Sequence, residues 1–509
     1  MARSLRILAL GAVLLLVPVL PAAAHPPDAD DAGSEHEHAD VDQQPTRQDR
    51  MSEVFHSPSG QINSDLAFWG DLAFAGYYGG FRIFDISRAT PQLVSDFKCY
   101  GPQNDVSVWD SDGDGQADLL FTSVDRTLTG PECGATGTAD HDDPTGWEGI
   151  RIFDVSNPEA PSQIGAVYQD CGSHTHTLVP DVANKRVLLY NSSYPLRPGP
   201  TCGPDRGPEA DRDPLHGVIQ VVQVPLANPA AAEEIAEPPI NYPGDPDNTF
   251  DPAEHGLAGF NPLRACHDIA VFVELRLAAA ACAEQAQLWR IGADMLPDTT
   301  NPLWVFDNPV DTDGPGGGDT AADFWHSATF TWDGKVVNFS DESFGDGCPP
   351  VTTITESGSP VVSDTGRTYF LDVRTGKELS QFMIPRTEED AYCSTHQGNV
   401  VPLPGRYILA QAWYMGGVNL IDFTSKKNPR EIAFHDRGPG GATGSDNWAH
   451  YWYERAPKPG SALRTYGQDG IHSPASGHGF QAFDSSASRG RRIGLTHLNP
   501  QTQERVLFR

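Results

Sequence analysis

Short runs in which apolar and polar residues alternate recur from about residue 53 to the end of the chain. A polar turn with Pro or Gly usually follows each run, a pattern typical of half-buried strands in a sheet. The runs also resemble one another. They are GGFRIFDISRATPQ from Gly79, GIRIFDVSNPEAPS from Gly149, GVIQVVQVPLANPA from Gly217, QLWRIGADMLPDTTNP from Gln287, GRTYFLDVRTG from Gly366, GGVNLIDFTSKKNP from Gly416 and GHGFQAFDSS from Gly477.

These copies are about 65 residues apart on average, which suffices for a four-stranded sheet with its loops. Two further short strands precede most copies. We therefore predict an all-β fold, a seven-bladed β-propeller with four-stranded antiparallel blades over residues 53–509. We expect Ile493 to His497 to close the ring by pairing near the first blade. The aligned position holds Asp85, Asp154, Gln223, Arg290, Asp372, Asp422 and Asp484.

The N-terminal segment differs from the repeats. Arg3 and Arg6 precede an apolar run that is too short to span a bilayer comfortably, and small residues up to Ala24 offer a cleavage site. We predict a signal peptide over residues 1–24, cleavage near Ala24, and a protein that is secreted or on the exterior of the cell envelope. Residues 25–52 are polar and acidic, and we expect a disordered acidic arm. No later segment is apolar enough for a transmembrane span.

Charge and composition narrow the function. The 509 residues contain 68 acidic and 35 Lys or Arg side chains, a formal net charge of −33. Such a surface repels nucleic acid and attracts cations, so nucleic-acid binding is excluded. The 50 glycines and 43 prolines argue against a bundle of long helices.

Three of the runs carry a recognisable motif. FRIFDIS, IRIFDVSNP and VNLIDFTSKKNP resemble the LVIVD repeat of secreted bacterial β-propeller proteins, and the resemblance extends over residues 60–490. The copies at Gln223 and Arg290 lack the acid of the motif. Membership of this family would imply a propeller fold and export, and it supplies no reaction. We expect the acid to be structural, closing the turn that follows it by accepting hydrogen bonds from backbone N–H groups.

Eight cysteines fit an oxidising compartment. Two pairs occupy equivalent places in successive repeats, which predicts the disulfides Cys99–Cys133 and Cys171–Cys202. Cys266 and Cys282 flank one expected hairpin and form the third predicted pair, which leaves Cys348 with Cys393. All four bridges would then constrain loops on one face of the propeller.

Histidines recur where the innermost strand of a blade is expected to begin. They are His174, His176, His267, His326, His396 and His450. Innermost strands line the channel of a propeller, so neutral imidazoles from several blades would converge on its axis. They would suit one transition metal, namely zinc, copper, iron or manganese. The acids Asp65, Asp105 and Asp268 are candidates for further ligands or for groups that orient the imidazoles. The alternative is a hydrogen-bonded or anion-binding histidine ring.

An acidic loop in the second repeat has the pattern DxDxDGxxD. Asp110, Asp112, Asp114 and Asp118 would supply carboxylates to calcium, and Gln116 a backbone carbonyl. Gly113 and Gly115 permit the sharp turn. We predict a structural calcium site, with a metal-free acidic hairpin as the alternative.

Two functions remain open. The first is an extracellular binding or scaffold protein whose axial histidines hold a metal, with an unknown extracellular protein or small molecule as its partner. The second is a copper- or iron-dependent oxidoreductase, because axial histidine clusters look similar in the propellers of carotenoid oxygenases and methanethiol oxidases. No catalytic residue can be nominated, since the sequence lacks a GxSxG motif and shows no general acid or base with a convincing partner.

Overall fold

The computed structural model describes residues 46–138, 146–193, 216–244, 249, 263–282, 285–307, 324–342, 347–348, 352–354, 360–362, 366–386, 388–438, 444–470, 477–488 and 490–508. The predicted signal peptide and residues 25–45 of the predicted arm lie outside these ranges. Within them, secondary structure consists of β-strands and two short 3-10 helices, Val182–Asn184 and Pro229–Ala231. No helix in this part of the chain is long and apolar enough to cross a membrane.

The first part of the chain forms three four-stranded antiparallel units in chain order. The first contains β3 (Asn63–Trp69), β4 (Leu72–Tyr77), β5 (Gly80–Asp85) and β6 (Gln92–Lys98). The second contains β7 (Gln103–Trp109), β8 (Leu119–Thr129), β9 (Trp147–Asp154) and β10 (Ser162–Tyr168). The third contains β11 (Thr175–Asp181), β12 (Arg186–Ser192), β13 (Gln220–Pro225) and β14 (Glu233–Ala236).

Two further units follow the same order. One contains β15 (Ile269–Phe272), β16 (Leu277–Cys282), β17 (Gln285–Arg290) and β18 (Trp304–Asp307). The next contains β19 (Trp325–Phe330), β20 (Val336–Asp341), β24 (Thr368–Asp372) and β25 (Glu378–Phe382). Two small strand pairs lie outside this pattern, β21 (Gly347–Cys348) with β26 (Glu388–Tyr392) and β22 (Thr352–Ile354) with β23 (Pro360–Val362).

The remaining strands form one nine-stranded sheet. Its order is β1 (Arg47–Asp49), β30 (Arg430–Asp436), β29 (Val418–Asp422), β28 (Arg406–Ala412), β27 (Gln397–Leu403), β31 (Asn447–Trp452), β32 (Leu463–Asp469), β33 (Gly479–Ser485) and β2 (Met51–Pro58). Two antiparallel units meet at its centre, where β27 and β31 pair in parallel over only two positions.

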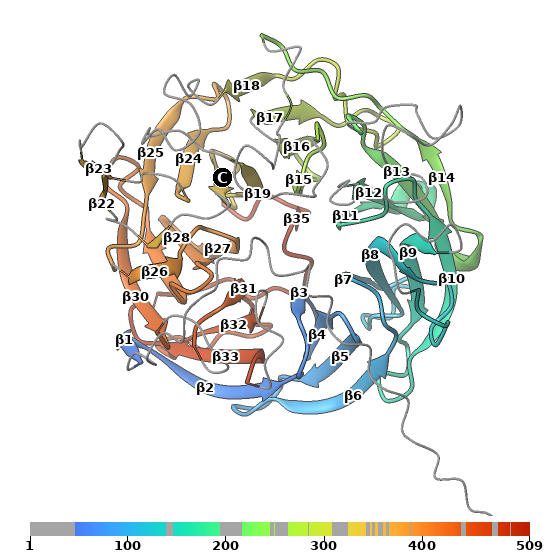
Figure 1. Ribbon diagram of the computed structural model, residues 1–509, viewed down its shortest axis with the longest axis horizontal. Helices are drawn as coiled ribbons and strands as arrows, with labels where there is room; N and C mark the ends of the chain where they lie inside the picture. Colours follow the sequence, from blue (N-terminus) through green and yellow to red (C-terminus); the bar gives the residue numbers. More distant parts are fainter. Residues whose placement is uncertain are drawn as a thin grey trace, which may run out of the picture.

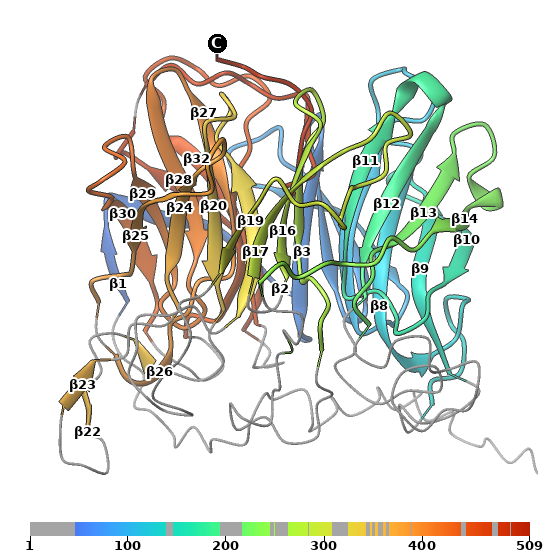
Figure 2. The ribbon, with the colours of Figure 1, turned by 90° about the horizontal axis from the view of Figure 1, so that it is seen from above.

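The sheets stand around a common axis and form a closed ring, which is the architecture of a β-propeller (Figure 1). The innermost strands are β3, β7, β11, β15, β19, β27 and β31, and Figure 2 shows the ring from the side. Every residue of β3 is buried, whereas every residue of the outer strand β6 is exposed or half-buried. This gradient follows from the fold, because an inner strand is covered on both faces and an outer strand meets solvent. Between neighbouring sheets the core is aromatic, as where Phe81 packs edge-on against Phe153.

The last sheet is completed by the N-terminus. Strand β2 pairs with β33 from Met51↔Ser485 to Pro58↔Gly479, and β1 pairs with β30. The predicted boundary of the arm at residue 52 is therefore wrong, because strands β1 and β2 include residues before it. Strands β31 to β33 leave the edge of β33 open, and an open edge needs a backbone partner. The acidic composition of this segment hid its alternating pattern.

The C-terminal tail, residues 496–508, crosses one end of the channel. Strand β34 (His497–Leu498) pairs with β3, so the expected contact between residue 497 and the first sheet is confirmed. Strand β35 (Thr502–Gln503) then pairs in parallel with β15 on a distant sheet. Between and beside them, side chains of the tail bond to other innermost strands: Asn499 to Val108 and Gln503 to Phe330. The ring is thus closed both by β2 and by this tail.

The motif acid has the predicted structural role. Asp85, Asp154 and Asp422 each accept a hydrogen bond from the backbone N–H two residues further along, at 2.8–3.0 Å. The alignment at Gln223 was two residues out of register. Leu226 N donates to Lys185 O just as Val155 N donates to Asp118 O, which makes Pro225 the counterpart of Asp154.

Two predicted disulfides are confirmed, Cys99–Cys133 and Cys266–Cys282. Cys171 and Cys393 are also disulfide-bonded. Their predicted partners are Cys202, which lies outside the described residues, and Cys348, whose side chain is not described. The described cysteines lie where innermost strands begin or second strands end, so they share one face of the ring.

A candidate metal centre on the propeller axis

The two faces of the ring differ. We call the face at which the innermost strands begin the histidine face, and the face crossed by residues 496–508 the tail face. Because strands alternate in direction, the start of an innermost strand and the end of the second strand meet at the same face. Side chains from these two places can therefore meet around the axis.

Four of the six predicted histidines form a continuous cluster at the histidine face. The ring centroids of His174 and His267 are 4.6 Å apart. Those of His267 and His326 are 3.8 Å apart, and those of His326 and His396 are 4.0 Å apart. All four residues are buried. We call these four residues the axial histidine cluster.

Hydrogen bonds between strand starts place the four imidazoles. Thr175 Oγ1 donates to His267 O at 2.8 Å, Asp268 N donates to His326 O at 3.0 Å, and Ser327 Oγ donates to His396 O at 3.0 Å. Each innermost strand is thereby tied to the next at the residue that carries the histidine. The contact between imidazoles is thus a consequence of how the sheets are joined around the axis.

Two of the imidazoles are held through Nδ1. His174 Nδ1 lies 2.8 Å from Asp125 Oδ2, and His396 Nδ1 lies 2.7 Å from Trp448 O. His267 Nδ1 is 3.5 Å from Asp268 Oδ1. Metal-binding histidines usually donate the N–H of the ligand-free nitrogen to a carboxylate or a backbone carbonyl, which leaves the other nitrogen for the metal. His174 and His396 have the Nδ1 contact of such a ligand, and His174 Nε2 also lies 3.4 Å from Gln103 Nε2.

His326 lies in the middle of the cluster and is 0% exposed. Neither of its ring nitrogens has a hydrogen-bond partner, although buried polar groups normally have one. Its Nε2 is 3.8 Å from Glu342 Oε2, and Glu342 also accepts a hydrogen bond from Tyr414 Oη. Ligand atoms of His267, His326 and Glu342 all lie within 4.8 Å of one another. This donor set of imidazoles with one carboxylate fits a transition metal.

The protonation state of the cluster favours the binding of a cation. Burial lowers the pKa of His326 far below its usual value, and the neighbouring histidines lower it further. Burial and His267 also lower the pKa of His174, although Asp125 opposes this shift. His326 and His174 are therefore neutral near pH 7, which is the form that binds metals. Burial alone would raise the pKa of Asp125, but Arg126 and His174 hold it below its ordinary value.

The other two predicted histidines lie outside the cluster, which corrects the sequence prediction. His176 is enclosed by hydroxyl groups, with Nε2 at 2.6 Å from Ser107 Oγ and Nδ1 at 2.8 Å from Ser123 Oγ. His450 Nε2 is 2.7 Å from Thr465 Oγ1, inside its own sheet. The pairing Gln397↔Ala449 shows the cause, because it sets Trp448, and not His450, opposite His396.

The predicted acids divide in the same way. Asp268 contacts His267 of the cluster, whereas Asp105 Oδ2 accepts from the backbone N of His176 at 3.0 Å. Asp65 accepts from Leu66 N at 2.7 Å and from Gln501 Nε2 of the tail at 2.9 Å. Asp65 and Asp105 thus bond to groups other than the four clustered histidines.

Sequence reasoning missed Asp125, Glu342 and Tyr414. Asp125 and Glu342 occupy equivalent places, each directly after the second-strand residue that pairs near the start of the innermost strand. An acid at this repeat position beside a histidine segment was the available signal.

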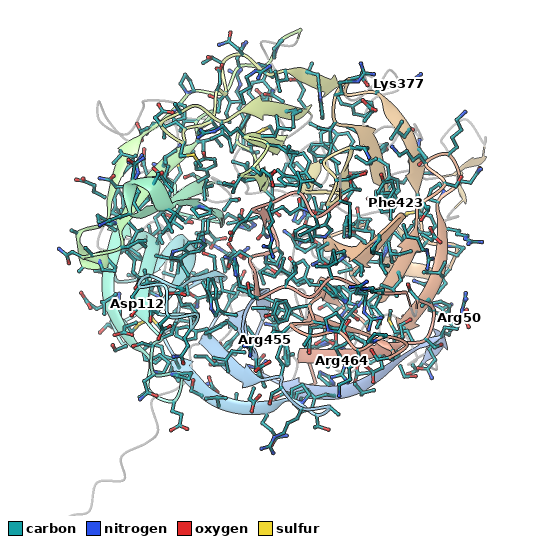
Figure 3. All side chains as sticks on the ribbon, turned by 180° about the vertical axis from the view of Figure 1, so that it is seen from behind. Arg50, Asp112, Lys377, Phe423, Arg455 and Arg464 are labelled. Carbon is teal, nitrogen blue, oxygen red and sulfur yellow. A yellow bond between two sulfur atoms is a disulfide. The ribbon has the colours of Figure 1, made fainter. Side chains whose placement is uncertain are left out.

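The acidic loop 110–118 brings together three of its five predicted ligands. Carboxylate atoms of Asp110, Asp112 and Asp118 lie within 4.8 Å of one another. Asp114 instead accepts bonds from the backbone and side chain of Gln116. Asp110 accepts from Gly113 N and Gly115 N at 2.6 and 2.8 Å, which folds the loop around its first carboxylate. Figure 3 labels Asp112 at the second sheet.

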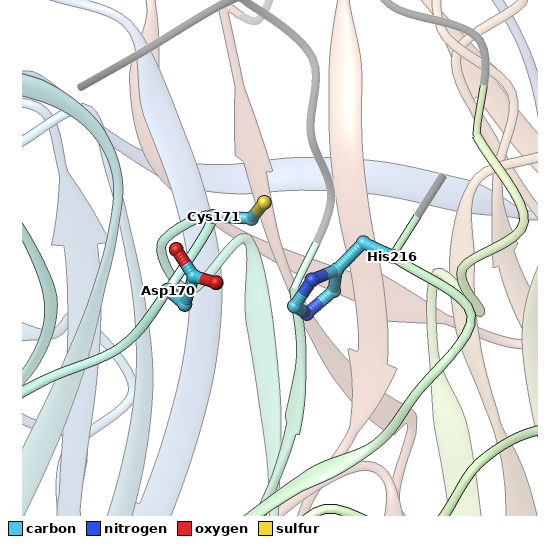
Figure 4. A group of neighbouring side chains, drawn as sticks. All are labelled: Asp170, Cys171 and His216. Carbon is cyan, nitrogen blue, oxygen red and sulfur yellow. The ribbon is translucent and has the colours of Figure 1, made fainter. Parts of the chain in front are cut away.

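A third group, Asp170, Cys171 and His216, also places potential ligand atoms within 4.8 Å of one another (Figure 4). Cys171 is bound in a disulfide, so it cannot provide the thiolate that a metal would require. This group is therefore a weaker candidate than the axial histidine cluster.

A cleft of about 920 Å³ lies on the tail face beside loop 110–118. Its wall contains Trp69, Trp109 and His497, and the rings of Trp69 and His497 stack at 4.1 Å. Lys185 and Arg455 also line it. The cleft is remote from the clustered histidines and contains none of them, so the chemistry of the two places is separate.

Fold and site together define a β-propeller with buried histidines on its axis. No family model and no curated protein sequence matches the chain, so its membership of the LVIVD-repeat family stays a prediction.

Among solved structures, the chain is similar to a protein from Lactobacillus plantarum (9% identity, TM-score 0.45, 87% of this chain and 98% of that chain). It is also similar to the β-propeller domain of Myceliophteria thermophila Cps50 (Swd1), with 8% identity, a TM-score of 0.45 and coverage of 87% and 100%. A third is Saccharomyces cerevisiae Sqt1, at 8% identity, TM-score 0.42 and coverage of 87% and 99%.

Proposed function

We propose that this protein is a secreted seven-bladed β-propeller of the LVIVD-repeat type that binds one transition metal ion through His174, His267, His326 and His396. The blade count takes the nine-stranded sheet as two blades, divided between β27 and β31. The protein would act outside the cell as a metal-dependent binding or scaffold protein. Zinc, copper, iron and manganese all accept imidazole ligands, so the metal is left open.

One observation carries this proposal. His326 is fully buried among three other imidazoles, and both of its nitrogens lack a hydrogen-bond partner. A buried group without partners costs about 1–3 kcal/mol. A metal ion would remove this cost at one of the two nitrogens, because an imidazole binds a metal through a single nitrogen. The contacts of His174 with Asp125 and of His396 with Trp448 support the same reading.

Loop 110–118 supports a second, structural site for calcium. Its three close carboxylates offer the hard oxygen ligands that calcium prefers. Trp69 Nε1 donates to Gly115 O at 3.0 Å, so an ion in the loop would also fix the contact between the first two sheets. The role would be to stiffen the hairpin.

The test compares two buried histidines. His326→Gln should reduce the transition-metal content of the purified protein from about one equivalent to near zero, measured by elemental analysis after dialysis. His450→Gln is the matched control, because His450 is equally buried, lies outside the cluster and should leave metal content unchanged. Equal metal content in wild type and His326→Gln would refute the axial site.

A metal-dependent oxidoreductase is the second candidate, and Glu342 favours it. This carboxylate lies between His326 and the hydroxyl of Tyr414, where it could accept a proton beside the metal. Oxygen consumption with an added reductant separates the two functions. An oxidoreductase should consume oxygen as the wild type and lose this activity together with its metal in His326→Gln, whereas a binding protein should consume none in either form.

A further inference from the structure

The cleft of about 920 Å³ on the tail face has a wall that comes from several sheets and from the C-terminal tail. Trp69 and Trp109 hold the same place in successive sheets, because they end the innermost strands β3 and β7. Their rings lie edge to face, with centroids 5.8 Å apart. The tail adds His497, whose pairing with Trp69 brings the two rings into their stacked contact. We call these three residues the aromatic corner of the cleft.

The indole N–H of Trp109 is a donor without a partner. Trp109 is only 7% exposed, and its Nε1 makes no hydrogen bond. The indole of Trp69, at the equivalent place, donates to Gly115 O at 3.0 Å. Buried indole N–H groups normally have an acceptor. Because Trp109 lines the cleft, an oxygen atom of a ligand bound there would supply the acceptor that the protein does not.

Lys185, at the other side of the cleft, is a second group that the fold does not use. It directly precedes β12 and has a left-handed backbone with φ 54°, where Gly405 stands before β28 with φ 70°. Any side chain is strained in this region. Arg276, which precedes β16 with φ 53°, donates to Gly292 O. The ammonium group of Lys185 makes no hydrogen bond or ion pair with the described residues, so it is available to a ligand.

Charges of both signs line the cleft. Asp110 and Asp112 come from the acidic loop, and Lys185 and Arg455 from other sheets. Calcium in loop 110–118 would leave its four aspartates with two negative charges in excess, which the two cations again balance. A ligand with a net charge therefore gains little here. A ligand with many hydroxyl groups can donate to the carboxylates and accept from the cations and the indole.

We propose that this cleft binds a neutral saccharide. The C–H face of a sugar ring would pack against the aromatic corner and against Val182, which is 67% exposed at the cleft wall. Its hydroxyl groups would bond to Trp109 Nε1, to Lys185 and to Asp112. Small-molecule sites commonly measure about 300–1,000 Å³, so the cleft suits a short oligosaccharide. The site contains none of the clustered histidines and does not depend on them.

The test is isothermal titration calorimetry of the wild-type protein, in buffer with calcium, against maltotriose, cellotriose, mannotriose and triacetylchitotriose. At least one of them should bind, and more tightly than trigalacturonate, which has three rings but carries carboxylates. Trp109→Phe keeps an aromatic ring and removes the donor, so the affinity for that trisaccharide should fall about three- to tenfold. Lys185→Met should lower it by a similar factor. Lys335→Met is the matched control, because Lys335 directly precedes β20 and lines a different cleft, so the affinity should not change.

Three results would overturn the proposal. The first is no binding of any of the four trisaccharides, and the second is an unchanged affinity in both Trp109→Phe and Lys185→Met. The third is tighter binding of trigalacturonate than of every neutral trisaccharide, which would assign the cleft to an anionic ligand. Lys185 is exposed, so Lys185→Met tests the site even if Trp109→Phe does not fold. Transition-metal content should equal that of the wild type in both variants, which keeps this outcome separate from that of the axial histidine cluster.

Discussion

Two side-chain amides of the C-terminal tail replace strand partners at the channel. Gln503 Nε2 donates to Phe330 O at 2.6 Å, and Gln503 Oε1 accepts from Phe330 N at 3.1 Å. Asn499 makes the same pair of bonds with Val108, at 2.9 and 2.8 Å. Each amide thus satisfies both backbone groups of one residue on the inner edge of an innermost strand, as a further strand would.

Replacing Gln503 with Met keeps the approximate size of the side chain and removes both hydrogen bonds. Phe330 is 0% exposed, so its N–H and C=O would be buried without partners. Each such group costs about 1–3 kcal/mol, and the free energy of unfolding should therefore fall by about 2–6 kcal/mol. Asn499→Leu should have an effect of similar size, because Val108 is equally buried.

Urea unfolding followed by tryptophan fluorescence measures this loss. Arg505→Ala is the control within the same tail, because Arg505 is exposed and should change stability by less than about 0.5 kcal/mol. If the unfolding free energies of Gln503→Met and Asn499→Leu both lie within about 0.5 kcal/mol of wild type, then water satisfies the backbone groups at the channel edge. The tail would then not stabilise the ring through these two amides.

Three further predictions concern other parts of the ring. Burial lowers the pKa of His450 to about 3, so this side chain resists protonation in the folded protein, and the wild type should lose stability as the pH falls below about 6.5. In His450→Gln, the loss of unfolding free energy should be shallower by up to about 1.4 kcal/mol per pH unit. Identical pH slopes for both proteins in urea unfolding would contradict the pKa shift. Replacing Cys99 and Cys133 with Ala should lower the free energy of unfolding by about 4 kcal/mol, because this disulfide spans 34 residues. Replacing Cys266 and Cys282 should lower it by about 3 kcal/mol, because that disulfide spans only 16. A larger loss in unfolding free energy for the shorter bridge would argue that loop entropy is not the cause. Calcium at 100 times its dissociation constant should stabilise the protein by about 2.7 kcal/mol through loop 110–118. Asp112→Asn should reduce the rise in melting temperature that calcium causes. An unchanged rise in this variant would exclude the loop as a calcium site.

The repeat made the architecture predictable. Alternating strands at regular intervals, with an acid closing each following turn, give sheets of one type, and Asp85, Asp154 and Asp422 behave as the pattern requires. The N-terminal strands were missed because β2 (MSEVFHSP) belongs to a sheet formed at the other end of the chain. Local composition cannot reveal a partner more than 400 residues away.

The candidate site was predictable in part for a related reason. A histidine at the start of an innermost strand reaches the axis only if the strand begins at the same level as its neighbours. His174, His267, His326 and His396 meet this condition, whereas His450 lies two residues too far along its strand. The register between neighbouring sheets decides at which level a strand begins. Comparing one repeat with another in the sequence does not reveal this register. The partners Asp125 and Glu342 directly follow second-strand residues that pair near the start of an innermost strand, and this pairing is not visible in the repeat alone.

The central claim is that four imidazoles from successive sheets bind one metal ion. X-ray absorption at the edge of whichever transition metal co-purifies with the wild-type protein tests it most directly. We expect about one metal per chain, with a first shell dominated by nitrogen at roughly 2.0–2.1 Å and the outer-shell scattering of imidazole. A first shell of oxygen or sulfur without imidazole scattering, or a protein that retains no transition metal, would contradict it.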